Sequence, residues 1–231
     1  MRFRILFILI LLFCITGCSK KNDTTTPDYI WDIDKNGIPK FVKTNFIELS
    51  KIYRISKYRS SVGHDYSDAS EQCRSLKHYF EPKSDVDWTT VKIYAPVKGV
   101  ITRAEQEWAG IKLEIDSEDF PAFRFSIFHI NTSRKYNIND KVVEGEFLGT
   151  HTGSQTYSDI SVIVNDPAKL GRMVSFFDVM TDALFIEFSD RGLSSRADVI
   201  IPKAIRDANP LTCSGDTFTS NEVLESWVYL N

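Results

Sequence analysis

NDKVVEGEFLG, residues 139–149, is the most informative stretch of the chain. Its apolar, β-branched and aromatic residues come in short runs, which asparagine, aspartate and glycine separate. Such runs, interrupted by residues that favour turns, are typical of antiparallel strands joined by hairpins. The pattern continues on both sides of this stretch, between about residues 40 and 165, so we expect a mainly β fold. The clearest expected strands are residues 91–94, 99–103, 111–115, 123–130, 142–148 and 160–164.

One of these strands alternates cleanly enough for its faces to be assigned. In residues 123–129, FRFSIFH, every second side chain points to the same side of a strand. Phe123, Phe125, Ile127 and His129 are therefore expected on one face, which places a histidine among apolar neighbours. Such a histidine is either a hydrogen-bonded core residue or part of a site.

After residue 167 the pattern changes to helical spacing. Apolar residues between 174 and 188 recur roughly at intervals of three and four, and Gly192 follows as a stop signal. A second helix is expected to start after the N-cap candidates Ser194–Ser195 and to end before Asn209–Pro210.

The composition is that of an ordinary globular domain. The chain has 231 residues, of which 42% are hydrophobic and 26% are charged, and this length is ample for one large core. The formal net charge of -3 leaves no basic field that would attract nucleic acid, so we exclude nucleic acid as a partner. We divide the chain into a β domain, residues 31–166, and a helical C-terminal extension, residues 167–231, packed on the same core.

The N-terminus has the layout of an export signal. Residues 1–17, MRFRILFILILLFCITG, start with two arginines and continue with an apolar run that is too short for a comfortable transmembrane helix. Their end, together with Cys18, resembles the bacterial lipobox, in which the signal is cut before a cysteine that becomes lipid-modified. Residues 18–30 are polar, charged and threonine-rich, so we expect a tether that joins the lipidated Cys18 to the folded part.

Export determines which cysteines remain for pairing. Cys14 would leave with the signal and Cys18 would carry the lipid, so Cys73 and Cys213 remain. Two thiols in an oxidising compartment are expected to form a disulfide. The alternative is a pair of buried free cysteines.

Three short segments precede the opening stretch in a recognisable series. Residues 63–68, GHDYSD, contain a His-x-x-x-Asp spacing, residues 95–101 read APVKGVI, and residues 128–130 read FHI. Together with residues 139–149, this series resembles the lysostaphin-like zinc endopeptidases, which cut peptidoglycan cross-links and have the duplicated hybrid motif fold. The resemblance spans residues 63–165 and implies a β-sandwich or barrel of that kind.

The resemblance also implies a zinc ion with three protein ligands and an open position for water. His64 and Asp68 match the first two ligands, and His129 matches a histidine that assists catalysis. The family's closing His-x-His strand is replaced here, since Asp159 stands at the position of a catalytic histidine and Ser161 at that of the third ligand. Serine is a poor neutral zinc ligand and two ligands rarely hold the ion, so we expect no cofactor, with zinc as the alternative.

The segment between Asp68 and Ala95 is longer than in the family and adds candidates. It contains His78, which, like His151 beyond the hairpin, could supply a substitute zinc ligand. Two other interpretations remain open: His64 and Asp68 as a hydrogen-bonded pair that organises a turn, and Asp159 as an ion-pair partner of His64 or His129. Aromatic faces and a guanidinium group that suit a sugar-binding or peptide-binding groove are offered by Tyr66, Arg74, Trp88 and Tyr157.

These observations predict a lipid-anchored protein of the bacterial cell envelope, sorted to the outer membrane. We expect a non-catalytic relative of the peptidases that binds cell-wall material or a partner protein. The alternatives are an active zinc-dependent peptidoglycan endopeptidase with an unusual third ligand, and a structural lipoprotein. The expected partners are the membrane, through the lipid on Cys18, and either peptidoglycan or an envelope protein.

Overall fold

The computed structural model describes residues 29–231, so the expected signal sequence, the lipidated Cys18 and almost all of the tether lie outside the described residues. Antiparallel strands dominate the described part, which confirms the expected mainly β fold. The strands are β1 Ile52–Ser56, β2 His78–Pro82, β3 Lys92–Tyr94, β4 Gly99–Glu107, β5 Gly110–Ser117, β6 Phe123–Thr132, β7 Lys141–Val142, β8 Phe147–His151, β9 Ser158–Val164, β10 Arg172–Val174, β11 Cys213–Ser214, β12 Thr217–Phe218 and β13 Trp227–Tyr229. The α-helices are α1 Ile33–Asn36, α2 Phe176–Val179, α3 Asp182–Ser189 and α4 Lys203–Ala208, and 3₁₀ turns lie at Leu49–Lys51, Trp88–Thr90 and Arg196–Val199.

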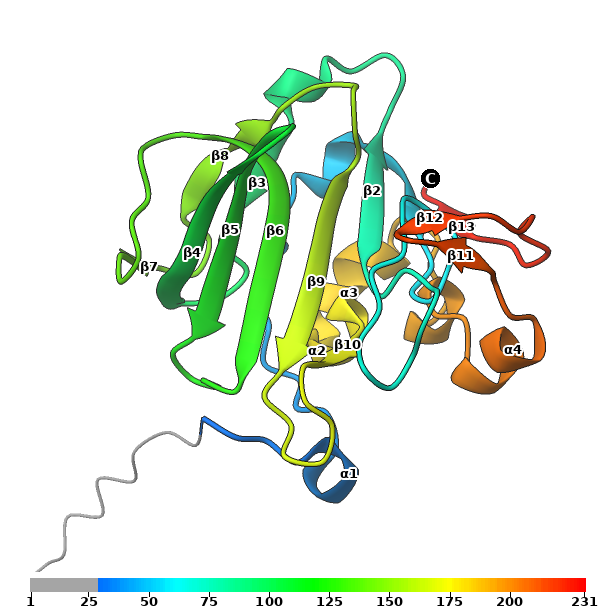
Figure 1. Ribbon diagram of the computed structural model, residues 1–231. Coiled ribbons are helices and arrows are strands. Elements are labelled where there is room, and N and C mark those ends of the chain that lie inside the picture. Colours follow the sequence, from blue (N-terminus) through cyan, green and yellow to red (C-terminus); the bar gives the residue numbers. More distant parts are fainter. Residues whose placement is uncertain (1–28) are drawn as a thin grey trace, which may run out of the picture.

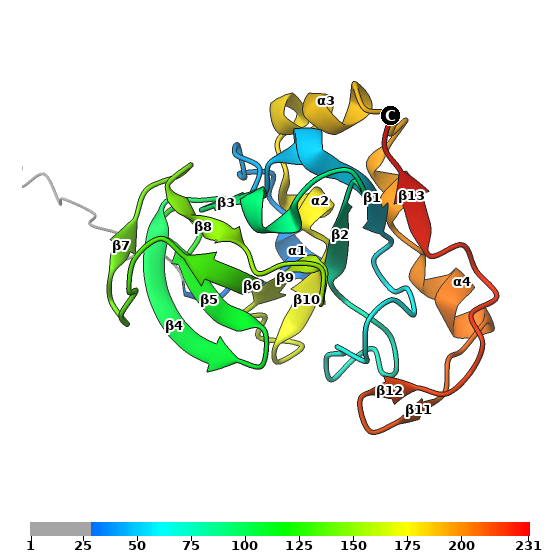
Figure 2. The ribbon, with the colours of Figure 1, turned by 90° about the horizontal axis from the view of Figure 1, so that it is seen from above.

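One large sheet organises the described residues. Its strand order is β13-β1-β2-β9-β6-β5-β4-β7, with β10 added to β9, and with β8 bridging β6 and β3. Helices α2 and α3 lie behind the sheet in Figure 1. From above, the end of the sheet that contains β4, β5 and β7 curls toward β8 and β3 (Figure 2).

The core lies between the sheet and the helices behind it. Phe125 and Ile127 of β6 and Ile160 and Val162 of β9 all belong to the main hydrophobic cluster, and Phe125 contacts Phe176 of α2 with 6.4 Å between ring centroids. Complete burial of each such side chain contributes roughly 1.5–3 kcal/mol. Because alternate residues of a strand point to opposite faces, the residues between these core positions point to the outer face.

The C-terminal region differs from the two expected helices. The apolar residues between 174 and 188 belong to β10, α2 and α3, which are separate elements. Ser175 caps α2 and Thr181 caps α3 through side-chain oxygens that accept backbone N–H bonds, so the chain turns between them. The second expected helix is also broken, because Pro202 separates the 3₁₀ turn from α4. The last strand, β13, pairs with β1 and extends the sheet.

Two features of the sheet differ from the strands that the sequence predicts. The expected strand at residues 142–148 is two strands, β7 and β8, separated by a turn in which Gly145 has a φ of +76°. Strand β2 was not expected at all. It lies between β1 and β9, and Lys77, directly before it, belongs to the buried charged cluster of the candidate site.

The disulfide between Cys73 and Cys213 is present, which confirms that pairing. It links the loop before β2 to the small β11–β12 hairpin. In residues 29–231 there is no helix with the length and apolar character needed to cross a membrane.

Candidate functional site

The candidate site is a cavity of about 560 Å³ on the outer face of the sheet. Strands β2, β5 and β6 and the loops before β2 and β9 form its walls. Five of the lining side chains are aromatic, and most of the others are polar or charged. The lining residues are Gly63, His64, Tyr66, Lys77, Tyr79, Glu107, Trp108, Lys112, Phe128, His129, Gln155, Thr156 and Tyr157.

A β-bulge in β6 directs two aromatic side chains to this cavity. Ile111 pairs with Ile130 and Leu113 with Ile127, so β6 has one residue more than β5 in this interval. His129 takes up the difference with a φ of +61°, which is uncommon for a residue other than glycine. The predicted face assignment of His129 is therefore wrong, because the bulge turns His129 and Phe128 together into the cavity while Ile130 joins the core.

The base of the cavity holds a buried cluster of charged groups. Register pairs Tyr79 of β2 with Asp159 of β9, so Lys77, just before β2, reaches Asp159 on the same face. Lys77 Nζ lies 2.8 Å from Asp159 Oδ2, and His129 Nε2 lies 3.3 Å from Asp159 Oδ1. The Asp159 side chain has no exposed surface and that of Lys77 is 2% exposed. From the sequence, His64 and His129 were the two candidate ion-pair partners of Asp159, and the structure places His129 beside it.

Aromatic rings complete the surroundings of the Lys77 ammonium. Its Nζ lies 3.6 Å from the centroid of the Phe128 ring and 4.1 Å from that of Tyr66. Cation–π contacts of this kind are worth about 2 kcal/mol when they are desolvated. Burial raises the pKa of the Tyr66 phenol above its usual range, and likewise that of Tyr79, so both remain neutral. The Tyr79 ring lies farther away, at 5.7 Å, so the cation has one carboxylate and three aromatic rings as neighbours.

One ring nitrogen of His129 is hydrogen-bonded to the main chain, and the other faces a carboxylate. Its Nδ1 lies 2.9 Å from the carbonyl oxygen of Ala109, and its Nε2 faces Asp159. A general base needs a free lone pair directed at its substrate. Both ring nitrogens of His129 face protein oxygen atoms, so neither is directed at a substrate in the cavity.

His64 and Asp68 serve different structural purposes. His64 is exposed at the rim of the cavity, and its Nδ1 lies 2.9 Å from the carbonyl oxygen of Asp65. Asp68 Oδ1 accepts hydrogen bonds from the Ser70 N–H, the Ser70 hydroxyl and the Glu71 N–H, while Oδ2 accepts one from the Met173 N–H. Asp68 thus organises its own turn and ties it to β10, without a hydrogen bond to His64.

The two candidate substitute zinc ligands, His78 and His151, are buried and hydrogen-bonded to other protein groups. His78 is buried on the core side of β2, with Nδ1 at 2.9 Å from the Ser56 carbonyl and Nε2 at 2.7 Å from the Ser175 hydroxyl. His151 is fully buried in β8, and its Nδ1 accepts a hydrogen bond from the Gly153 N–H. Burial lowers the pKa of each of these histidines to about 4, so both are neutral at pH 7.

The donor set does not fit a catalytic zinc ion. A hydrolytic zinc site needs three protein ligands that converge, with the fourth position open to water. In residues 29–231 no three histidine, cysteine, aspartate or glutamate side chains converge in this way. Ser161, at the position of the third ligand, is buried, and its hydroxyl has no hydrogen-bond partner among the described residues. No step of a reaction is therefore assigned to zinc.

The sequence candidates for a binding groove separate into two groups. Tyr66 and Tyr157 line the cavity, whereas Arg74 and Trp88 do not. Arg74 forms ion pairs with Glu71 and Asp207, at 3.0 Å each. Sequence reasoning assigned no role to Lys77 or Trp108. Lys77 could have been found only with the position of β2, because its partner Asp159 is 82 residues away.

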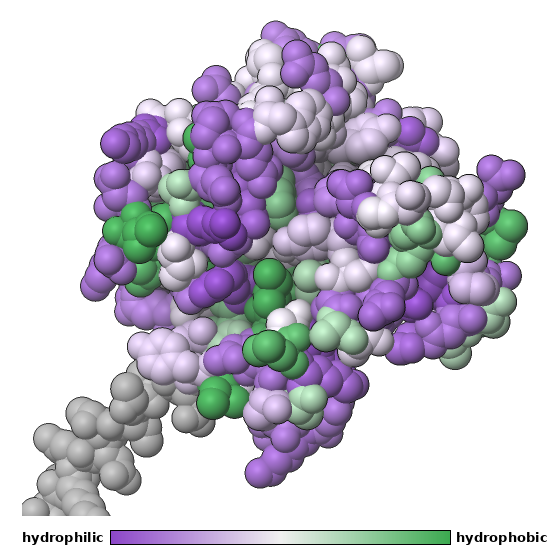
Figure 3. Space-filling view, in the orientation of Figure 1, coloured by the Kyte–Doolittle hydropathy of each residue, from purple (hydrophilic) through white to green (hydrophobic). Residues whose placement is uncertain are grey.

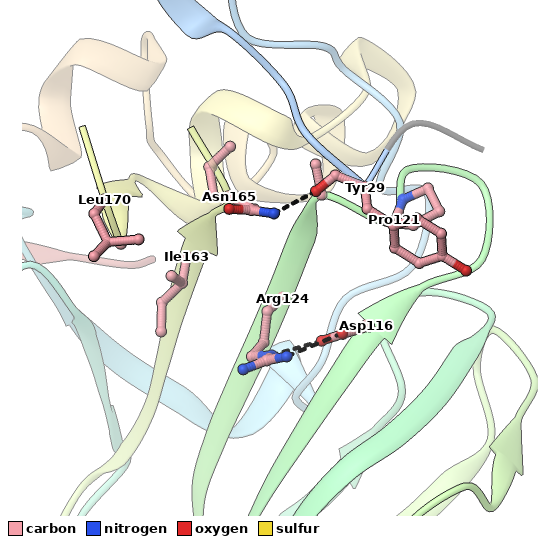
Figure 4. A pocket seen from close by; sticks show the side chains of 10 residues that line it. Tyr29, Asp116, Pro121, Arg124, Ile163, Asn165 and Leu170 are labelled. Carbon is pink, nitrogen blue, oxygen red and sulfur yellow. Dashed lines mark hydrogen bonds and ion pairs between the residues drawn. The ribbon is translucent and has the colours of Figure 1, made fainter. Parts of the chain in front are cut away.

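A second, smaller cavity of about 390 Å³ lies on the same face, at the end of β9 (Figure 4). Arg124 forms an ion pair with Asp116 here, at 2.6 Å from Nε to Oδ1, and Asn165 donates a hydrogen bond to the Tyr29 carbonyl oxygen. Figure 3 shows this face as mostly hydrophilic, with hydrophobic residues gathered near its lower end. The aromatic lining and the buried charges belong to the larger cavity.

No protein-family model matches the chain, and no curated protein matches it. Solved structures similar to it include lytM from Ruminococcus gnavus, at 14% identity and a TM-score of 0.35, over 45% of this chain and 43% of that one. Others are the SpoIIQ-SpoIIIAH pore forming complex, at 12% identity and a TM-score of 0.43 over 67% and 99%, and lysostaphin, at 15% identity and a TM-score of 0.31 over 48% and 49%. The chain thus spans less than half the length of lytM and lysostaphin. These similarities agree with the expected resemblance to lysostaphin-like peptidases and concern the fold alone.

Proposed function

We propose that this chain is a non-catalytic binding protein of the cell envelope, and that it holds cell-wall material in the cavity on the outer face of its sheet. The observation that supports this most directly is the cluster of Lys77, Asp159 and His129. In this cluster the Lys77 ammonium neutralises the Asp159 carboxylate, which would otherwise be available for chemistry.

The cluster is unsuited to hydrolysis for three physical reasons. A zinc ion would meet the repulsion of the buried Lys77 ammonium. Asp159 already neutralises that ammonium, so it is not a free base. His129 directs both ring nitrogens to protein oxygens rather than to a water molecule in the cavity.

The cavity nevertheless retains the properties of a binding site. Its volume lies within the roughly 300–1,000 Å³ that is usual for ligand pockets. Its walls combine aromatic rings with a few polar groups, which is the composition expected of such pockets. The location in the envelope is proposed from the lipobox-like residues around Cys18, which would hold the protein at a membrane next to the wall.

Cosedimentation of the full chain, purified in detergent, with insoluble peptidoglycan tests this proposal. We expect the protein to sediment with the peptidoglycan and to release no soluble muropeptides, with or without added zinc. Thr156→Trp, a substitution at the cavity wall, should abolish sedimentation because it fills the cavity. Release of muropeptides that depends on zinc would establish the peptidase alternative instead, and absence of binding by the wild-type chain would refute the proposal.

A further inference from the structure

Trp108 is an exposed aromatic residue held in a fixed position at the mouth of the cavity. It occupies the two-residue turn between β4 and β5, in which Glu107 pairs with Gly110, and it is 74% exposed. The turn is attached to β6, because the Ala109 carbonyl oxygen lies 2.9 Å from His129 Nδ1. The Trp108 and His129 ring centroids lie 5.7 Å apart. The indole is therefore presented to solvent from an immobilised turn.

The polar groups at the rim have unused hydrogen-bonding capacity. His64 binds Asp65 through Nδ1, which leaves Nε2 available at the exposed rim. Glu107 accepts a hydrogen bond from the Gln106 side-chain amide through its main-chain carbonyl, and in residues 29–231 its carboxylate takes part in no ion pair. Gln155 and Thr156 add an amide and a hydroxyl at the same rim.

The two lysine side chains that line the cavity are balanced by internal partners. Lys77 is neutralised by Asp159, and Lys112 lies 2.8 Å from Glu114. An anionic ligand would therefore find no unpaired cation at the base of the cavity. The unpaired Glu107 carboxylate at the rim would also repel an anion, so a ligand without negative charge, such as a neutral one, fits this cavity better.

The strands that form the base do not offer a free edge to a peptide. Strand β6 lies between β5 and β9, and β2 lies between β1 and β9, so their backbone groups are already paired. Binding of a peptide as an added strand requires an unpaired edge. The cavity instead offers aromatic faces surrounded by hydrogen-bonding side chains.

We infer that the cavity binds a neutral sugar ring, stacked on Trp108, of the glycan part of the cell wall. A pyranose has an apolar face of C–H groups and a rim of hydroxyl groups, which match the indole face and the polar rim residues respectively. This inference rests on the proposed wall-binding function and specifies which part of the wall is bound.

Isothermal titration of the full chain in detergent with a tetramer of N-acetylglucosamine tests the inference, alongside stem peptides freed from glycan. We expect the sugar tetramer to bind, and Trp108→Ala to weaken its binding about tenfold, since loss of one aromatic contact costs about 1.4 kcal/mol. Trp108→Phe should retain most of the affinity because a ring remains. Tyr53→Ala is the matched control, because Tyr53 is 45% exposed on β1 and lies outside the cavity.

The other possible results distinguish a failure of the sugar inference from a failure of the wall-binding proposal. If the tetramer fails to bind, or binds Trp108→Ala as tightly as the wild type, the sugar inference is overturned. If stem peptides bind while the sugar does not, the wall-binding function stands and its ligand is the peptide. If neither the fragments nor intact peptidoglycan bind, both proposals fail. Circular dichroism of Trp108→Ala should match the wild type, since the residue is exposed.

Discussion

Lys77 is the residue on which the interpretation of the site depends. An ammonium group that is 2% exposed is tolerated only because Asp159 lies 2.8 Å away and two aromatic rings cover it. Removal of one partner from a buried ion pair is costly, because the other charge is left without compensation. The two side chains therefore depend on one another.

Asp159→Asn should lower the free energy of unfolding by about 3–5 kcal/mol, because it leaves the Lys77 ammonium buried without a counter-charge. Lys77→Met/Asp159→Asn removes both charges and should recover most of that loss. Urea unfolding of the wild type and both variants measures the difference. If the double variant is as unstable as Asp159→Asn, the loss comes from packing and the ion pair has no special importance.

At the scale of the residue, the sequence indicated two members of this cluster and not the third, because only two of them belong to a motif. Asp159 and His129 were named because they occupy positions in a recognised series. Lys77 was missed because its role depends on the register of β2 against β9. The face of His129 was misassigned because a positive φ at a non-glycine residue leaves no trace in an alternating pattern.

At the scale of the element, strand β9 places two polar side chains on the cavity face of the sheet. Asp159 and Ser161 alternate with core residues Ile160 and Val162, so both lie on the cavity face where the family would place two histidines. Ser161 lies opposite Ser126 of β6. Histidines substituted at these positions would therefore point toward the cavity.

Lys77→Met/Asp159→His/Ser161→His should still fail to retain stoichiometric zinc. Only the new histidine at position 161 stands at an expected ligand position, while His64 lies at the exposed rim of the cavity. The Asp68 carboxylate is occupied by three N–H groups and a hydroxyl in its own turn and on β10, so three ligands do not converge. Metal analysis after dialysis against zinc measures the result, and Lys77→Met/Asp159→Asn is the control. Stoichiometric zinc that disappears after Asp68→Ala would show that this turn rearranges to bind metal.

The long central strands were largely predictable from the sequence, whereas the elements at the C-terminus were not. Strands β4, β5, β6 and β9 carry local patterns of β-branched and aromatic residues bounded by turns. The C-terminal apolar residues are buried because three short elements pack on one sheet, and their spacing imitates a helix. Capping by Ser175 and Thr181 decides the breaks, and a spacing pattern does not register such caps.

At the scale of the whole molecule, long-range pairing holds the sheet together. The C-terminal β13 pairs with β1, and the disulfide joins the loop before β2 to the β11–β12 hairpin, across 140 residues of sequence. Several cavity residues, including His64, Tyr66 and Lys77, lie in or next to that disulfide-linked loop. The disulfide thus reduces the conformational freedom of the unfolded chain. In the folded protein it also fastens the segment that forms one wall of the cavity.

Cys73→Ser/Cys213→Ser should lower the free energy of unfolding by about 4–5 kcal/mol, the value that the chain-entropy model gives for a closed loop of this length. Equilibrium urea unfolding of the oxidised wild type, the reduced wild type and the double variant measures it. The reduced wild type should match the double variant, because both lack the same constraint. A loss below about 1 kcal/mol would mean that the unfolded chain gains little freedom when the link is absent. In that case the non-covalent pairing of β13 with β1, rather than the disulfide, would be what keeps the C-terminal region on the sheet.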